Sequence, residues 1–173
     1  MAKSSKYNKL DEPLKKLESL SDQLLWKNYE YKNKFEYICE VQPDEENERF
    51  VITDSKKENM RRSCVYIMVI DGRIFKIGTA LRGMAGRIGS YNSGKVKYRT
   101  KGTNSGANYW VLHSMLHFKK KVTFYAYYPS ITKCKVFGET IDEPFPSSKT
   151  IEGVILRQFE KKYGKKPIGC TQG

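Results

Sequence analysis

Residues 64–91, with the sequence CVYIMVIDGRIFKIGTALRGMAGRIGSY, decide the fold of this chain. The run 65–70 is almost entirely apolar, which is typical of a buried strand. Asp71-Gly72 is a favoured pair for a tight hairpin turn, and 73–78 alternates polar and apolar residues like a returning strand. Residues 81–91 then predict a short helix. The order strand, turn, strand and helix predicts an α/β (α+β) core around a small antiparallel sheet, flanked by helices.

The length and composition favour one soluble domain. A chain of 173 residues can bury one real core with an extra layer. The N-terminus is polar, and no apolar run approaches about 20 residues, so we expect a cytosolic protein without a membrane span. The cysteines, Cys39, Cys64, Cys134 and Cys170, show no C-x-x-C pair. We therefore expect reduced thiols and no zinc knuckle.

The net charge of +13 is concentrated in one part of the chain. Residues 61–135 hold 15 Lys and Arg but a single acid, Asp71, whereas the rest holds 17 basic and 18 acidic residues. An excess gathered around the hairpin predicts a polyanionic partner, and nucleic acid is favoured. Membrane headgroups are the lesser interpretation, because the basic stretch contains no amphipathic helix with a large apolar face.

Patterns outside the central stretch predict the remaining elements. Leucines at helical spacing predict an N-terminal helix over 11–28, followed by an acidic loop at 42–48 and a short strand at 49–53. Residues 1–60 are expected to decorate a core formed by 61–173. After a surface loop or hairpin at 92–106, a helix is expected over 107–118 and strands over 122–128 and 131–137. A proline-bearing loop is expected over 142–148, and a last helix over 148–163 ended by Gly164.

The order of these residues resembles the GIY-YIG nuclease superfamily. Val65-Tyr66-Ile67 stands at the first signature, and Lys76-Ile77-Gly78 stands where the family has Tyr-Ile-Gly. Arg87 falls on the helix arginine, Tyr91 on a position held by histidine or tyrosine, and Glu152 on the metal-binding glutamate. The resemblance covers about half of the chain, residues 64–167, around an insertion at about 92–121. Lys76 departs from the family tyrosine, and no asparagine follows Pro167.

The resemblance implies a magnesium-dependent nuclease, most similar to the small Type II restriction endonucleases of bacteria. Such an enzyme cuts double-stranded DNA at a specific sequence, and we expect a homodimer because one chain offers one catalytic set. Hydrolysis of a phosphodiester needs an activated water and charge neutralisation. Tyr66 is the expected general base, Lys76 the cation that lowers its pKa, Arg87 the phosphate ligand, Tyr91 a positioning group and Glu152 the ligand of one Mg²⁺.

The basic stretch supplies the expected DNA contacts. Base edges are read in the grooves, so specificity should come from loops around the catalytic core. The candidate DNA-binding residues are Arg82, Lys95, Lys97, Tyr98, Arg99, Lys101, Asn104 and Ser105.

Three alternatives stay open at this stage. The chain can be a non-catalytic nucleic-acid-binding module, in which basic and tyrosine residues hold single strands. It can also be a repair or mobile-element nuclease of the same superfamily. His113 and His117 have a spacing that can serve zinc, but no third ligand accompanies them, so contacts to nucleic acid or ordinary helix positions are favoured.

Overall fold

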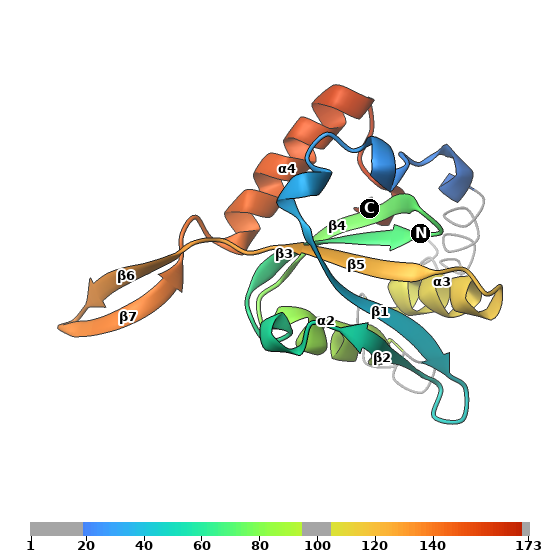
Figure 1. Ribbon diagram of the computed structural model, residues 1–173, viewed down its shortest axis with the longest axis horizontal. Helices are drawn as coiled ribbons and strands as arrows, with labels where there is room; N and C mark the ends of the chain where they lie inside the picture. Colours follow the sequence, from blue (N-terminus) through green and yellow to red (C-terminus); the bar gives the residue numbers. More distant parts are fainter. Residues whose placement is uncertain (1–18, 95–104, 171–173) are drawn as a thin grey trace, which may run out of the picture.

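The computed structural model describes residues 19–94 and 105–170, which form one antiparallel five-stranded sheet, a separate hairpin and three α-helices (Figure 1). The strands of the sheet lie in the order β2-β1-β5-β3-β4. Their bounds are β1 Glu36–Asp44, β2 Arg49–Ser55, β3 Cys64–Ile70, β4 Arg73–Ala80 and β5 Val122–Tyr127. The helices are α2 Gly83–Asn92, α3 Ser105–His117 and α4 Ser148–Tyr163. The expected α+β class, with helices flanking a central antiparallel sheet, is confirmed.

The predicted hairpin at 64–80 is present as β3 and β4. Asp71 and Gly72 both have positive φ values, 50° and 77°, as a two-residue hairpin turn requires. The register places Tyr66 opposite Gly78, with a bulge between Met68 and Val69. All seven residues of β3 are buried, because this strand has helices over both of its faces.

The molecule has three layers, and each face of the sheet has its own apolar core (Figure 1). Helices α2 and α3 cover one face with Met84, Ile88, Val111, Leu112 and Met115. The helix α4 covers the other face together with the aromatic segment at 29–35, and its Phe159 packs against Tyr29 there. The described apolar side chains of α3, Val111, Leu112, Met115 and Leu116, are therefore core residues.

The N-terminal helix expected over 11–28 is absent from the described part of that range. Residues 19–28 instead form two short 3-10 turns, η2 Ser19–Asp22 and η3 Trp26–Asn28. Between them Leu25 is extended and bridges to Arg73, while the N–H of Ile74 donates to Leu24 O at 2.9 Å. The edge of β4 offers unpaired backbone groups, and pairing with them outweighs the helical spacing of the leucines. Residues 11–18 of the expected helix lie outside the described residues.

Residues 36–55 differ from the expectation of a decorating region, because they supply β1 and β2 of the central sheet. The expected acidic loop at 42–48 is shorter, since 42–44 end β1 and only 45–48 form the turn. The short strand expected at 49–53 is confirmed as β2.

The strands β6 Ile131–Val136 and β7 Glu139–Pro144 form a two-stranded hairpin that projects from the core (Figure 1). The expected loop over 142–148 is wrong in its first three residues, which belong to β7. The turn between these strands, Phe137-Gly138, has positive φ at both positions. Phenylalanine is not a usual residue in such a turn, which is why the sequence did not indicate it.

The last helix, α4, has the predicted bounds and end signals. The side chain of Ser147 accepts a hydrogen bond from Thr150 N, and Gly164 ends the helix in a left-handed conformation. Two 3-10 turns, η4 Lys32–Lys34 and η5 Lys57–Asn59, connect other elements, and η7 Ile168–Cys170 follows α4. In the described ranges 19–94 and 105–170, no helix has the length and apolarity needed to cross a bilayer.

Candidate active site

Tyr66 lies in the middle of β3 with its ring packed across Gly78 of β4. Tyr66 is 1% exposed, and a Cβ atom at Gly78 would lie 2.5 Å from its Oη atom. No side chain fits at such a distance, so the glycine is required for the ring to lie there. This close approach explains the Ile-Gly pair of the sequence pattern in physical terms.

Tyr91, near the end of α2, meets Tyr66 hydroxyl to hydroxyl. The two oxygens lie 2.5 Å apart, and Tyr91 is 2% exposed. Arg87 lies one helical turn earlier, and its guanidinium carbon is 5.9 Å from the centre of the Tyr66 ring. The predicted grouping of Tyr66, Arg87 and Tyr91 is thus present in the structure.

Burial dominates the electrostatics of the two tyrosines. It raises the pKa of Tyr66 well above the usual 10.0; the neighbouring Tyr91 raises it further, whereas Arg87 lowers it. Burial likewise raises the pKa of Tyr91 to about 12, against the lowering effects of Tyr66 and Arg87. Both phenols are therefore protonated at neutral pH in this structure.

Thr79, which the sequence patterns did not single out, links Arg87 to Glu152. The Arg87 guanidinium donates to the Thr79 carbonyl oxygen, and the Thr79 hydroxyl donates to the Glu152 carboxylate. Thr79 lies on β4, the edge strand, so its carbonyl and hydroxyl can serve groups from two layers. The only available sequence signal was its place directly after the Ile-Gly pair.

Arg87 also has a donor without a partner. Its Nε atom is buried and has no hydrogen bond among the described residues. Buried unsatisfied donors are uncommon and concentrate where a ligand completes the site. A phosphate oxygen is the kind of acceptor that suits a guanidinium.

Glu152 lies in the second turn of α4 beside the apolar stripe that packs on the sheet. Ile151, Ile155 and Leu156 pack in that core, while Glu152 is half-buried and turned toward Thr79. The start of α4 is attached to the start of β3, because Ser148 Oγ lies 2.8 Å from Ser63 Oγ. This attachment fixes the start of α4 beside the hairpin, where Glu152 contacts Thr79 of β4. The other carboxylate of the helix, Glu160, is exposed and pairs with Lys166 at 3.5 Å.

Lys76 contacts the C-terminal turn. Its Nζ atom donates to Gly169 O at 2.6 Å. Next to it, the Cys170 Sγ atom accepts from Ile77 N at 3.2 Å and donates to Ile77 O at 3.1 Å. Burial raises the pKa of Cys170, whereas its hydrogen bond with Ile77 and the charge of Lys76 lower it. For Tyr66, Arg87 is a cation that lowers the pKa.

The expected DNA-binding residues are only partly described. Arg82 is exposed at the start of α2, and Ser105 is the first residue of α3. The others, Lys95, Lys97, Tyr98, Arg99, Lys101 and Asn104, lie outside the described residues. His113 and His117 lie on α3, and no group of three or more metal-ligating side chains occurs among the described residues.

The residues present fit a magnesium ion better than a structural metal. Glu152 is a single carboxylate beside a hydroxyl, and Mg²⁺ is commonly held by one or two carboxylates while it keeps several waters and phosphate oxygens. A zinc site needs three or four nitrogen or sulfur ligands, which the described part of this site does not provide.

The site thus combines a buried tyrosine pair, an arginine and a carboxylate on a five-stranded α+β core. No protein-family model and no curated protein matches the chain. Among solved structures, restriction endonuclease HPY188I in complex with product DNA matches with a TM-score of 0.65 and 42% sequence identity, over 91% of this chain and 91% of that chain. The chain therefore belongs to the family of this restriction endonuclease. A mutant of bacteriophage T4 EndoII matches with a TM-score of 0.60 and 18% identity, over 79% of this chain and 96% of that chain, which shows a shared fold.

Proposed function

We propose that the protein is a Type II restriction endonuclease of the GIY-YIG superfamily that cuts double-stranded DNA at a specific sequence with Mg²⁺. One observation carries the proposal. Tyr66, Tyr91, Arg87 and Glu152 come from three elements and gather at the Gly78-Thr79 end of one hairpin. They do so in a chain whose relative HPY188I was solved with product DNA.

In the proposed reaction, Tyr66 in its deprotonated form takes a proton from the attacking water. The water oxygen forms a new bond to phosphorus, the ester bond on the far side breaks, and the leaving oxygen takes a proton from solvent. Arg87 neutralises charge on the phosphoryl oxygens, and Tyr91 orients the Tyr66 oxygen through their short contact. Glu152 would hold the Mg²⁺, which would supply positive charge at the phosphate and the leaving oxygen. Besides Arg87, Lys76 supplies a second positive charge, from β4, where its Nζ atom donates to the Gly169 carbonyl of the C-terminal turn.

In the first experiment, the wild-type protein and the variant Glu152→Gln are each incubated with phage DNA and Mg²⁺. Discrete bands are expected from the wild type, because a restriction enzyme cuts at defined sites. The variant should bind DNA within about threefold of the wild type but not cut it, since the lost ligand removes chemistry and few phosphate contacts. A smear indicates a nonspecific nuclease, and intact DNA indicates a binding module. Substantial cutting by Glu152→Gln removes this residue from the metal site.

DNA is expected to contact the basic stretch around the site. Neutralising Lys95, Lys97, Arg99 and Lys101 to glutamine should weaken binding and flatten its salt dependence, because fewer counterions are released. Binding is measured from 50 to 200 mM salt, and an unchanged slope places the DNA elsewhere. Glutamine variants of Lys161 and Lys165, on or after α4 and outside the basic range, are the matched control.

We further propose a two-fold homodimer on a symmetric site. One chain holds one set of Tyr66, Arg87 and Glu152, and equivalent cuts in two strands follow directly from two chains related by a two-fold axis. Light scattering with and without cognate DNA should give two chains per site, with linear plasmid as the main product. One chain per site with accumulating nicked plasmid contradicts the dimer.

A further inference from the structure

The helix α2 carries Arg87 and Tyr91, yet its own sequence has a low intrinsic tendency to form a helix. Gly83, Gly86 and Gly89 lie among its ten residues, and a glycine inside a helix costs about 1 kcal/mol relative to alanine. The N-cap residue, Arg82, makes no capping hydrogen bond with its side chain. The position of α2 must therefore depend on contacts with other elements.

The first of these contacts lies at the start of the helix. The N–H of Ala85 donates to Met60 O at 3.2 Å, which gives a partner to one of the free N–H groups of the first turn. Gly83 lies so close to Met60 that an added Cβ would be 2.2 Å from its carbonyl oxygen. The chain before β3 thus holds the start of α2.

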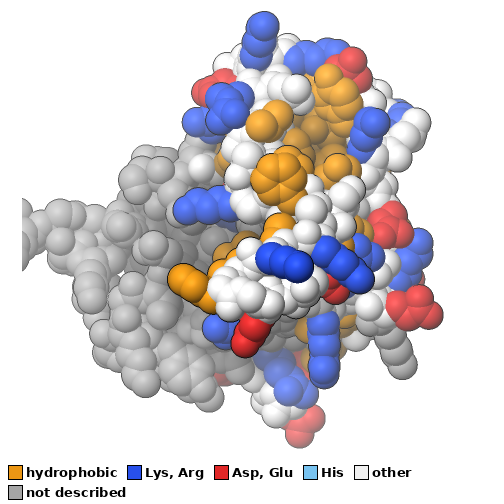
Figure 2. Space-filling view, turned by 90° about the vertical axis from the view of Figure 1, so that its left-hand side faces the viewer, with side chains coloured by type: hydrophobic (Ala, Val, Ile, Leu, Met, Phe, Trp, Pro, Cys, Tyr) orange, Lys and Arg blue, Asp and Glu red, His pale blue; other side chains and the backbone are white. Residues whose placement is uncertain are grey.

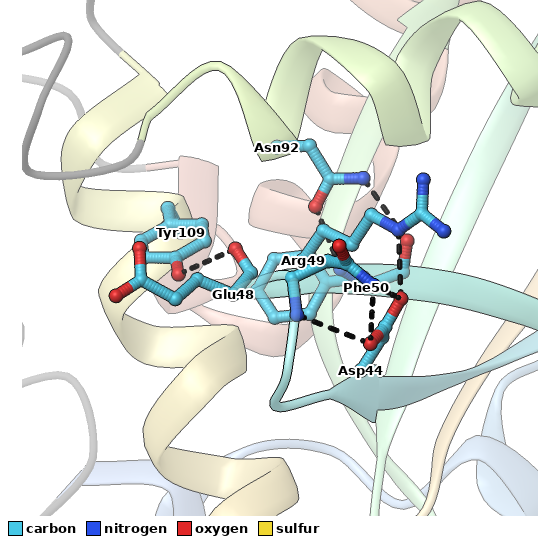
Figure 3. A network of polar contacts seen from close by, with 7 residues as sticks. Asp44, Glu48, Arg49, Phe50, Asn92 and Tyr109 are labelled. Atoms are coloured by element: carbon cyan, nitrogen blue, oxygen red, sulfur yellow. Dashed lines mark hydrogen bonds and ion pairs between the residues drawn. The ribbon is translucent and has the colours of Figure 1, made fainter.

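At the other end of α2, Asn92 makes a two-pronged contact with the backbone of Phe50 (Figure 3). The Oδ1 atom of Asn92 accepts from Phe50 N at 2.7 Å, and its Nδ2 atom donates to Phe50 O at 3.0 Å. Asn92 is the last residue of the helix, whereas its sequence context, Asn-Ser-Gly, indicated a loop.

The backbone of Phe50 needs this partner. Phe50 is 3% exposed and lies on β2, an edge strand of the sheet, opposite Pro43 of β1. Asn92 binds both its N–H and its C=O, and because these two groups of one residue point to the same side of an antiparallel strand, they face the open edge of the sheet, away from β1. The side-chain amide of Asn92 therefore occupies the place that a neighbouring strand would take, and satisfies both backbone groups of a buried residue.

The turn at 45–48, which joins β1 to β2 just before Phe50, is itself held by side-chain contacts. Arg49 Nε donates to Asp44 Oδ2 at 2.8 Å, and Tyr109 of α3 donates its hydroxyl hydrogen to Glu48 O at 3.0 Å (Figure 3). The ring of Tyr109 packs on Phe50 with 5.1 Å between centroids. Asn92 thus binds to a firm support.

We infer that Asn92 is a positioning residue, which fixes the end of α2 so that Tyr91 meets Tyr66 and Arg87 meets Thr79. The inference rests on the proposed nuclease function. Asn92 directly follows Tyr91, so a shift of this helix end changes the 2.5 Å contact between the two hydroxyls. A misplacement of about 1 Å in a catalytic constellation can lower the rate by about a hundredfold.

The test is Asn92→Ala, measured for single-turnover cleavage, DNA affinity and thermal unfolding. We expect kcat to fall by about tenfold to a hundredfold while KM and the DNA Kd stay within about threefold. Asn47→Ala is the matched control: Asn47 lies in the turn between β1 and β2, and its side-chain amide donates to Asp44, so cleavage should be unchanged. Wild-type kcat in Asn92→Ala overturns the inference, as does an equal loss in DNA affinity.

A second variant separates position from stability. A Cβ at Gly89 meets no atom within 4 Å, so Gly89→Ala should strengthen α2 without new contacts. In the double variant Asn92→Ala with Gly89→Ala, we expect the Tm to recover toward the wild-type value, whereas kcat should stay as low as in Asn92→Ala alone. Recovery of both means that Asn92 only stabilises the fold. If the wild-type protein itself does not cut DNA, the proposed nuclease function is wrong. That outcome is distinct from failure of the inference about Asn92, which needs an active wild type and a fully active Asn92→Ala.

Discussion

The hydroxyl oxygens of Tyr66 and Tyr91 lie 2.5 Å apart in the core between the sheet and α2. Each buried phenol is the hydrogen-bond partner of the other, and Arg87 lies over the Tyr66 ring. Tyr66, the proposed general base, therefore has a fixed position and a raised pKa.

Tyr66→Phe should abolish cleavage and leave the fold intact. The ring keeps its packing against Phe124, 5.9 Å away between centroids, and only the hydroxyl that handles the proton is lost. A loss of about 10²- to 10⁴-fold is expected for a general base. Tyr91→Phe should cost less, because it removes only the orienting group. Cleavage rates and Tm values measure this, and near wild-type cleavage by Tyr66→Phe makes Tyr66 an ordinary core residue.

Gly78→Ala should inactivate the enzyme and lower its Tm, because the new Cβ would lie 2.5 Å from Tyr66 Oη and force the ring away. Gly89→Ala, on the open side of α2, is the matched control and should keep full activity. Circular dichroism and cleavage of both variants check the prediction. It is contradicted if Gly78→Ala cuts DNA as fast as Gly89→Ala does.

Cleavage should rise with pH over a wide range. Burial raises the pKa of Tyr66, so only a small fraction of the Tyr66 hydroxyls is deprotonated at neutral pH. As long as the pH is below this pKa, the deprotonated fraction increases tenfold for each unit by which the pH rises. We expect the logarithm of the single-turnover rate to rise with a slope of about 1 from pH 6 to 9. Tyr91→Phe serves as a comparison, since Tyr91 itself raises the pKa of Tyr66. A plateau already at pH 7 assigns the base to another group.

The folded state should lose stability at alkaline pH. Burial raises the pKa of both Cys39 and Cys64 from 9.0 to about 12. Between these values the unfolded chain has released protons that the folded chain still holds, so the free energy of unfolding falls as pH rises. Below pH 9 the two states hold the same protons at these groups, and no such change is expected. Thermal unfolding from pH 7 to 11 measures the effect. The loss should be smaller in Cys64→Ala, provided that the variant folds, and an equal loss contradicts the assignment.

The excess of basic residues within 61–135 agrees with an anionic partner, and most of the candidate DNA-binding residues lie outside the described residues. Figure 2 shows Lys and Arg side chains mixed with Asp and Glu side chains over the face from which the β6 and β7 hairpin projects, with an apolar area among them. The hairpin itself carries Lys133 and Lys135 on β6. These charges lie within the range 61–135 that the sequence marked as basic.

The sequence alone determined the hairpin, the last helix and the members of the site. An apolar run, an Asp-Gly turn and an alternating strand depend on neighbours in the chain, and so do the Ser147 cap and the Gly164 end of α4. The order Tyr66, Arg87, Tyr91 and Glu152 named the candidate catalytic residues, and the structure brings them together through Thr79 and the paired hydroxyls.

Only the tertiary structure decided how the edges of the sheet are completed. Leucine spacing at 20–25 predicted a helix, but the free edge of β4 bound that segment in extended form. Asn92 serves Phe50 from 42 positions away, and Cys170 serves Ile77 from 93 positions away. Such contacts leave no periodic pattern in the sequence, because they form only where folding brings an unpaired backbone group next to a polar side chain. They are stabilised because buried backbone N–H and C=O groups need hydrogen-bond partners.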